Sequence, residues 1–195
     1  ALPTIDGFQL IKKLGQGGMG AVFLARQISM DRIVAVKILP PKMSKDEQFV
    51  SRFQREVRMA GKLNHAHVIN AIHSGCENGC YFLAMEFVDG SNLRDEIEKR
   101  GALPEKEALE LIRQAALGLR CAHENGLIHR DVKPDNLMLD RNGQVKVADL
   151  GLARACKDDG NLTQTGMILG TPHYASPEQA RGETNLDHRA DIYSL

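Results

Sequence analysis

The sequence has no excess of charge of either sign. Its 25 Lys and Arg residues are balanced by 25 Asp and Glu residues, so the formal net charge at pH 7 is zero. Nonspecific binding to nucleic acid or to an anionic membrane surface draws on a strong positive excess. The balance gives no support for either kind of partner, and we expect no nucleic-acid ligand.

Long apolar runs are missing as well. The longest are short and interrupted by charged residues, whereas a membrane-spanning helix needs about 20 mostly apolar residues. The first residues, Ala-Leu-Pro-Thr, have neither the basic nor the apolar region of a signal peptide. We therefore expect the chain to be cytoplasmic and without a membrane segment of its own, and we leave open an anchor elsewhere in the full-length protein.

Cysteine is scarce. The four residues are Cys76, Cys80, Cys121 and Cys156. Cys76 and Cys80 are spaced as C-x3-C, but neither a second pair nor a histidine pattern accompanies them, and a structural zinc site needs four ligands. Reduced thiols in a cytosolic protein are the simpler interpretation.

The chain has enough apolar residues for a buried core. With 195 residues and 43% apolar content it can form one domain or two small lobes. β-Branched and aromatic runs predict five strands in the first part, and the spacing of apolar residues predicts one helix, Asp46–Leu63. The pattern favours a five-stranded antiparallel sheet with one packed helix. The strands are expected at Phe8–Leu14, Ala21–Ile28, Arg32–Leu39, Val68–Ser74 and Tyr81–Val88.

The pattern changes after the fifth predicted strand. Two helices are predicted at Asn92–Lys99 and Pro104–Glu124, and two short strands follow at Leu137–Leu139 and Val145–Ala148. Roughly Leu152–Ser176 lacks periodicity, and we expect such a long segment in a compact domain to be functional or mobile. The fold class is therefore α+β, with a small antiparallel β part and a mainly helical part.

A glycine-rich segment lies between the first two predicted strands. Gly15 to Gly20 reads G-x-G-x-x-G, and glycines let a backbone approach phosphates closely. A plain hairpin turn would look the same, and a dinucleotide-binding loop would need a helix directly after it and an acidic residue about 20 positions on. Strand-like residues follow here, and Lys37 stands where that acid would be sought. A loop that covers nucleotide phosphates fits better, formed by Leu14, Gly15, Gln16, Gly17, Gly18, Met19 and Gly20.

Lys37 ends the run Val-Ala-Val-Lys, and Glu56 lies on the predicted helix beside Phe53 and Val57. A lysine in a strand can be a solvated edge residue, and a helix glutamate can be solvated too. A carboxylate beside a buried face needs a partner, however, and Lys37 is the obvious one. We predict that a Lys37–Glu56 ion pair holds the lysine for the α- and β-phosphates of ATP.

The most specific motif runs from His129 to Asn136 and reads His-Arg-Asp-Val-Lys-Pro-Asp-Asn. An accidental loop rarely matches eight positions. We predict that Asp131 accepts the proton of the attacking hydroxyl, that Lys133 neutralises the transferring phosphoryl group and that Asn136 holds Mg²⁺. Asp149 precedes Leu-Gly directly after a predicted strand and would supply the second metal ligand, although leucine replaces the usual aromatic residue.

With these motifs in order, the chain resembles the eukaryotic-type protein kinases, and most closely their bacterial Ser/Thr branch. Gly170 to Glu178 resembles the end of a kinase activation segment, with Ser176 where the simplest form has alanine. Gly-Met-Gly at 18–20 and Thr-Gln-Thr at 163–165 are similar to the bacterial branch. The resemblance implies a bilobal fold, with an N-terminal lobe over residues 8–88, a partial C-terminal lobe over 89–195 and ATP between them.

The resemblance also implies roles for single residues. Met85 would be the gatekeeper, although it and Met138 read equally well as plain core residues. Glu86 and Val88 would bond adenine through backbone groups, and Asp191 would steady the backbone around Asp131. The residues implied around the adenine ring are Val22, Ala35, Met85, Glu86, Val88 and Met138.

The implied activity is transfer of the γ-phosphoryl group of Mg-ATP to Ser or Thr hydroxyls of proteins. Lys133 and Thr171 indicate Ser or Thr as the acceptor. Arg130 before Asp131 implies control by phosphorylation, because a phosphate pairs well with arginine. We expect Thr163 and Thr165 to be autophosphorylated and to dock on Arg130; two ordinary polar loop residues are the alternative.

Three other functions compete. A pseudokinase acting as a scaffold normally lacks Lys37, Asp131 or Asp149, and all three are present. A small-molecule kinase would lack the glycine loop and the segment that ends at Glu178, and a nucleotide-binding oxidoreductase fails the helix requirement above. The sequence stops a few residues into an apparent helix, so we expect a longer protein. In the family Glu178 pairs with a downstream arginine, and we expect the 195-residue piece alone to be unstable or inactive.

Overall fold

The computed structural model describes residues 3–18, 20–150 and 172–195. The chain forms two compact units. The first unit comprises Ala1–Gly61 and Asn70–Phe87, and the second comprises Lys62–Ile69 and Val88–Leu195. Each unit has a sheet of its own, with five strands in the first and three in the second.

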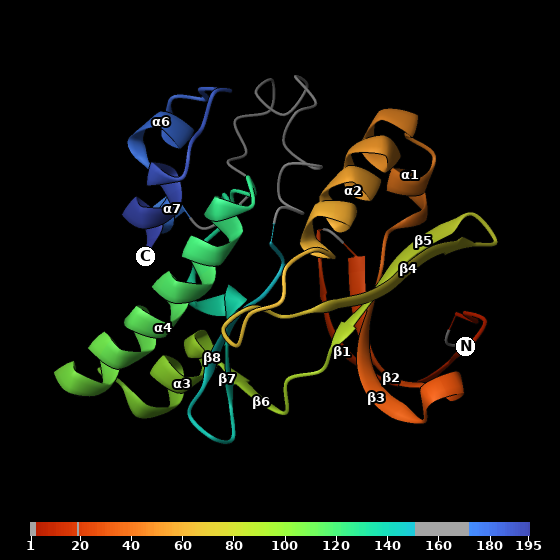
Figure 1. The fold of residues 1–195 in the computed structure, drawn as a ribbon, viewed down its shortest axis with the longest axis horizontal. Helices are drawn as coiled ribbons and strands as arrows, with labels where there is room; N and C mark the ends of the chain where they lie inside the picture. Colours follow the sequence, from red (N-terminus) through yellow and green to blue (C-terminus); the bar gives the residue numbers. More distant parts are fainter. Residues whose placement is uncertain (1–2, 19, 151–171) are drawn as a thin grey trace. The chain divides into compact units, whose positions relative to one another are not determined.

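The sheet of the first unit has the order β1-β2-β3-β5-β4, and each neighbouring pair is antiparallel (Figure 1). The predicted five-stranded antiparallel sheet is thus confirmed. Alternate side chains of its strands form a core that includes Phe23, Val34 and Phe82. The strands are β1 (Phe8–Gly17), β2 (Gly20–Gln27), β3 (Arg32–Ile38), β4 (Ala71–Glu77) and β5 (Cys80–Glu86).

The helix predicted in this unit is α2 (Glu47–Ala60). Asp46 caps its N-terminus by accepting hydrogen bonds from the backbone N–H groups of Gln48 and Phe49. The helix buries Phe49, Phe53, Glu56 and Val57, whereas Ala60 of the predicted face is only half-buried. A short helix α1 (Pro41–Ser44) precedes it, where the sequence indicated only the end of a strand, because Pro41 suits the first turn of a helix.

The second unit is built on the long helix α4 (Glu105–Glu124), which packs against β8 (Val145–Val147) (Figure 1). Gly118 lets the backbone of His67 lie close to α4, since a Cβ atom at position 118 would lie 2.2 Å from the carbonyl oxygen of His67. Gln114 accepts a hydrogen bond from the backbone N–H of Val145 at 2.8 Å. This buried face therefore includes a glycine and an amide that an apolar pattern does not predict.

The remaining strands of this unit are β6 (Gly90–Asn92) and β7 (Leu137–Asp140), in the order β6-β7-β8. Strand β6 was not predicted, and its last residue, Asn92, is the first residue of the helix predicted at Asn92–Lys99. The helix α3 (Leu93–Arg100) begins one residue later, because Asn92 caps it by accepting from the backbone N–H of Asp95.

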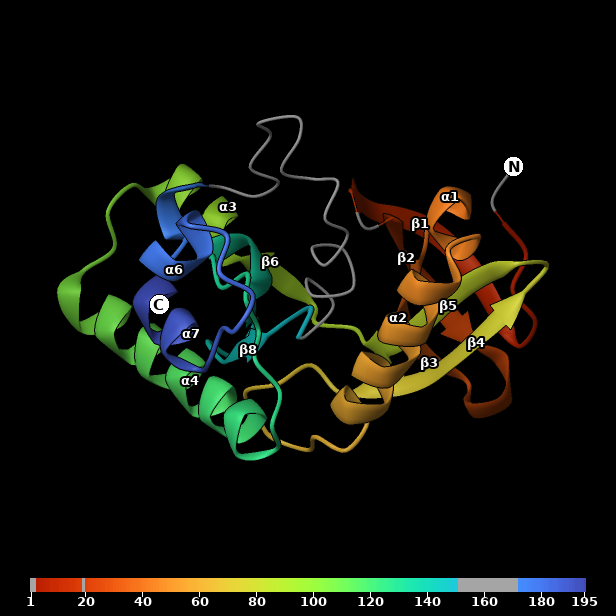
Figure 2. The same ribbon diagram turned by 90° about the horizontal axis from the view of Figure 1, so that it is seen from above.

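The end of the chain contributes α6 (Pro177–Ala180) and α7 (Arg189–Ser194), and α7 lies beside α4 in two perpendicular views (Figures 1 and 2). Three 3₁₀ turns complete the described structure, at Ile28–Met30, Pro134–Asn136 and Pro172–Tyr174. None of the described helices has the length and apolar character needed to cross a bilayer.

Candidate active site

The loop after α4 brings three predicted catalytic side chains together. Lys133 Nζ lies 2.8 Å from Asp131 Oδ2, and both side chains are about one-fifth exposed. Asn136 Nδ2 donates to the backbone carbonyl of Asp131 at 2.8 Å and lies 3.2 Å from Asp131 Oδ2. The 3₁₀ turn at Pro134–Asn136 makes this possible, because it turns Asn136 back toward the residue five positions earlier. The ammonium of Lys133 and the amide of Asn136 thus both approach the carboxylate of Asp131, which is partly open to solvent.

The backbone before Asp131 is held in an unusual conformation. Arg130 has φ +67°, in the left-handed region that a residue with a Cβ atom rarely adopts. The carboxylate of Asp191, fully buried on α7, accepts from the backbone N–H of His129 at 2.8 Å and of Arg130 at 2.7 Å. His123 Nε2 lies 2.7 Å from the same carboxylate. The predicted role of Asp191 is therefore confirmed, and His123 joins it.

Charge and burial oppose each other at Asp191. Burial alone raises the pKa of its carboxyl, because the charged form loses its water. The hydrogen bond from His123, the electrostatic interaction with the His129 ring and the hydrogen bonds from the N–H groups of His129 and Arg130 favour the charged form. Their sum lowers the pKa of Asp191 below its ordinary value of 3.8, so the carboxylate is charged at neutral pH.

The two residues predicted to hold a metal lie on neighbouring segments. The backbone N–H of Ala148 donates to the carbonyl of Asn136 at 2.9 Å, and Asp149 is the next residue. Asp149 has φ +57°, a second left-handed position in this region. Asn136 and Asp149 are half-buried, as expected of groups that reach toward a ligand.

This pair fits Mg²⁺ rather than zinc. Mg²⁺ is commonly held by one or two carboxylates together with substrate phosphates and water. The described part of the chain contains no group of three His, Cys, Asp or Glu side chains that could bind a metal by themselves. Cys76 pairs with Tyr81 and Cys80 with Glu77 on the β4–β5 hairpin, so the two thiols face opposite sides of the sheet and cannot share an ion.

In the first unit the glycine segment forms the turn of the β1–β2 hairpin. Gly17 pairs with Gly20, and Val22 pairs with Lys37 on β3. Gly20 has φ +112°, and a Cβ atom there would lie 2.0 Å from the carbonyl oxygen of Ile38, so the fold itself requires glycine. At Gly15 and Gly17 a Cβ atom would meet none of the described residues within 4 Å, so packing against this part of the chain does not explain these two glycines.

Lys37 and Glu56 are the charged side chains of the first unit that the structure buries among its described residues. Lys37 on β3 is 4% exposed, and Glu56 on α2 is 5% exposed. Arg55 also approaches Glu56, with 3.4 Å between guanidinium nitrogen and carboxylate oxygen. The burial agrees with the reasoning that led to a Lys37–Glu56 pair, and the pair itself stays a prediction.

The residues expected around adenine are divided between the units. In the first unit β3 and β5 pair Ala35 with Met85, and the side chain of Glu86 accepts from Asn70. Met85 and Ala35 are buried, Val22 is half-buried and Leu14 is 42% exposed. In the second unit Val88 is buried and Met138 is half-buried. Met19, Thr163, Thr165, Thr171 and Cys156 lie outside the described residues.

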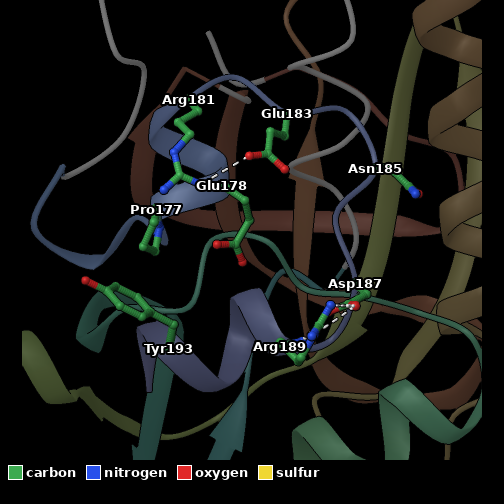
Figure 3. A pocket seen from close by; sticks show the side chains of 8 residues that line it. All are labelled: Pro177, Glu178, Arg181, Glu183, Asn185, Asp187, Arg189 and Tyr193. Carbon is green, nitrogen blue, oxygen red and sulfur yellow. Dashed lines mark hydrogen bonds and ion pairs between the residues drawn. The ribbon is translucent and has the colours of Figure 1, made fainter.

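A pocket of about 470 Å³ opens between α6 and α7 (Figure 3). Glu178 points into it, and two ion pairs, Arg181–Glu183 and Arg189–Asp187, stand at its wall. The side chain of Glu178 is half-exposed in this open pocket, and its pairing with a downstream arginine stays a prediction.

Two residues that support the catalytic loop, one directly and one through Asp191, were not predicted. Gln179 donates from Nε2 to the carbonyl of Arg130 at 2.8 Å, and His123 bonds Asp191. Ser-Pro-Glu-Gln matches the capping box that begins helices, and Ser176 does cap α6, but this pattern does not point to the bond with Arg130. No local pattern marks His123, because its partner is 68 residues away.

A comparison with protein families finds that the model described as protein kinase domain matches residues 8–195. The serine/threonine-protein kinase PknB of Mycolicibacterium smegmatis is 45% identical over 195 residues, which is 97% of this chain and 31% of that protein. The serine/threonine-protein kinase PrkC of Bacillus subtilis is 40% identical over 188 residues, 96% of this chain and 29% of that protein. The chain spans about a third of the length of these curated relatives.

The fold is similar to that of a solved structure. The crystal structure of the PknI kinase domain of Mycobacterium tuberculosis matches with a TM-score of 0.79 and 32% sequence identity. The match covers 100% of this chain and 74% of that one.

Proposed function

Since this chain belongs to the protein kinase domain family, we propose that it is the catalytic part of a serine/threonine protein kinase, which moves the γ-phosphoryl group of Mg-ATP to Ser or Thr hydroxyls of proteins. The observation that carries the proposal is the cluster of Asp131, Lys133 and Asn136. It places a cation and a metal-binding amide each within hydrogen-bond distance of the carboxylate that accepts the proton. These are the groups that phosphoryl transfer between oxygens needs.

Asp131 is the proton acceptor in this proposal. The substrate oxygen attacks the γ-phosphorus as its proton passes to a carboxylate oxygen of Asp131, and the bond between that phosphorus and the oxygen of the departing ADP breaks. Lys133, 2.8 Å from Asp131, neutralises the negative charge on the phosphoryl group during transfer. Most of the rate enhancement comes from position and charge, because little covalent chemistry falls to the protein.

Asn136 and Asp149 would hold Mg²⁺, which supplies positive charge to the phosphates when bound. Asn136 is well placed because its amide already turns toward Asp131, so a metal ligand and the proton acceptor are oriented by one hydrogen bond. Asp149 is directed by its left-handed backbone and by the bond between Ala148 and Asn136.

ATP binding is proposed for residues of both units. In the first, Gly15 and Gly17 support a phosphate-covering hairpin, because a Cβ atom at either position would fill space that none of the described residues occupies. Buried Lys37, paired with Glu56, would grip the α- and β-phosphates. Adenine would be held by Val22, Ala35, Met85, Glu86, Val88 and Met138.

The same proposal covers the acceptor of the phosphoryl group and the regulation of the kinase. Protein hydroxyls are the substrates, and the domain acts in the cytoplasm, where ATP is found. Thr163 and Thr165 would be autophosphorylated and dock on Arg130. A pseudokinase scaffold is the alternative, and the presence of Lys37, Asp131 and Asp149 disfavours it.

The test uses the full-length protein, ATP labelled at the γ-phosphate and a generic protein substrate. We expect label on serine or threonine, and none after Mg²⁺ is removed with EDTA. Nucleotide binding without transfer would support the scaffold instead. Label on a small molecule but not on protein would support a small-molecule kinase.

A further inference from the structure

The side chain of Gln179 joins α6 to the catalytic loop through two different atoms. Its Oε1 accepts from the backbone N–H of Ser176 at 3.1 Å, which is one half of the capping box. Its Nε2 donates to the carbonyl of Arg130 at 2.8 Å. One amide therefore caps a helix and contacts the residue before the proposed proton acceptor.

Arg130 is the residue of the loop that most needs support. Its left-handed φ of +67° costs about 1–3 kcal/mol unless neighbouring groups fix it. The Asp191 carboxylate holds its N–H at 2.7 Å, and Gln179 holds its carbonyl at 2.8 Å. Both backbone polar groups of the strained residue are thus gripped, one from α7 and one from α6.

The second contact requires an amide. A capping box is satisfied by glutamate as well as by glutamine, because only the oxygen of the side chain takes part. A glutamate at position 179 would still accept from Ser176, but it would place a carboxylate oxygen against the carbonyl of Arg130. The chain thus carries the member of the pair that can also donate.

We propose that Gln179 is a positioning residue for Asp131, because it holds the left-handed turn at Arg130 and so directs the carboxylate that follows. The inference rests on the proposed function. It adds that one hydrogen bond links the segment Pro172–Ala180 to the catalytic loop. A shift of α6 would therefore change the position of the proton acceptor. Gln179 touches no reacting atom in this proposal.

Two variants of the full-length protein separate positioning from capping. Gln179→Glu keeps the acceptor of the capping box and removes the donor to Arg130. Ser176→Ala removes the hydroxyl that caps α6 and leaves both contacts of the Gln179 amide. Gln9→Glu, the same chemical change at an exposed position of β1, is the control for added charge.

We expect Gln179→Glu to lower kcat about tenfold, the factor that corresponds to one hydrogen bond of ordinary strength, with KM for ATP unchanged. Ser176→Ala and Gln9→Glu should keep kcat within about twofold of the wild type, a difference well below one such bond. Wild-type kcat in Gln179→Glu would overturn the proposal. An equal loss in Ser176→Ala would overturn it too, because the cap alone would then explain the effect.

A second measurement does not depend on activity. Hydrogen–deuterium exchange of a peptide covering the loop from Leu127 to Lys133 should be faster in Gln179→Glu than in the wild type and unchanged in Gln9→Glu. If the wild type transfers no phosphate, the proposed function fails. The exchange measurement still shows whether Gln179 positions the catalytic loop. Unchanged exchange in Gln179→Glu would overturn it.

Discussion

The ring of His129 is bonded to the backbone beside Asp149: His129 Nε2 lies 2.9 Å from the carbonyl oxygen of Ala148. Its other nitrogen, Nδ1, accepts from the backbone N–H of Asp131 at 3.2 Å. A carbonyl can only accept and an N–H can only donate, so the neutral ring with its proton on Nε2 satisfies both contacts. One fully buried histidine therefore ties together the segments that carry the two acidic residues of the candidate site.

His129→Leu should loosen this tie at nearly constant volume. The carbonyl of Ala148 and the N–H of Asp131 would lose their partners, so we expect the free energy of unfolding to fall by about 1–3 kcal/mol per unsatisfied group. Urea denaturation followed by circular dichroism measures the change. His173→Leu, the same substitution at an exposed histidine, is the control and should change stability little. Equal stabilities of the two variants would contradict the assignment.

Asp191→Asn tests the anchor of the loop. The amide keeps one acceptor but presents its NH₂ group to the N–H of His129 or Arg130, so we expect a loss of about 1–3 kcal/mol at pH 7. The pKa of Asp191 is lowered in the folded state, so its contribution is complete above the ordinary value of 3.8. It is lost as the pH falls through the lowered folded-state pKa. The stability difference between wild type and Asn should shrink in that acid range, and a difference that grows there would refute the sign of the shift.

Two glycine substitutions should affect different properties: Gly20→Ala should lower stability, and Gly15→Ala should lower the affinity for ATP. Gly20→Ala places a Cβ atom 2.0 Å from the carbonyl oxygen of Ile38 at φ +112°, so thermal melting should show a clear loss of stability. Gly15→Ala meets none of the described residues within 4 Å and should melt like the wild type, while its affinity for ATP falls. Calorimetric titration with Mg-ATP measures the affinity. Unchanged affinity in Gly15→Ala would remove the argument for a phosphate-covering loop.

The predicted Lys37–Glu56 pair can be tested with a double-mutant cycle. Lys37→Met and Glu56→Gln should each lower kcat, because each leaves the phosphates misplaced. If Glu56 acts only through Lys37, the double variant should be no slower than Lys37→Met alone. Multiplicative losses in kcat would show that the two side chains act independently. Turnover at the wild-type rate in Lys37→Met would remove the lysine from the mechanism.

Local patterns predicted the fold well where one face of an element is buried. The five strands and α2 lie within a few residues of their predicted positions. The spacing of apolar residues, every second residue in a strand and every three or four in a helix, shows which face is buried. The resemblance to bacterial Ser/Thr kinases is supported by relatives from two bacteria. Helix α1, strand β6 and the Ser176 cap of α6 were not predicted, because short elements have too few residues to show a period.

The candidate site was predicted only in part, since its support is long-range. The motif from His129 to Asn136 is local, so Asp131, Lys133 and Asn136 could be predicted to lie close together, and in the second unit they do. Gln179 and Arg130 are 49 residues apart, and neither has a pattern that points to the other. The same holds for Gly118 on α4, whose need for glycine comes from the backbone of His67. Such contacts depend on tertiary packing, and the sequence of a single helix or strand does not show which distant residues will pack against it.

We propose that Asp131 accepts the proton of a protein hydroxyl. The most direct measurement compares phosphoryl transfer and ATP binding in Asp131→Asn and in Asp135→Asn, the same substitution at an exposed aspartate of the same loop. We expect Asp131→Asn to lower kcat about 10²–10⁴-fold with nearly unchanged ATP affinity, whereas Asp135→Asn stays active. Transfer at the wild-type rate by Asp131→Asn would contradict the proposal.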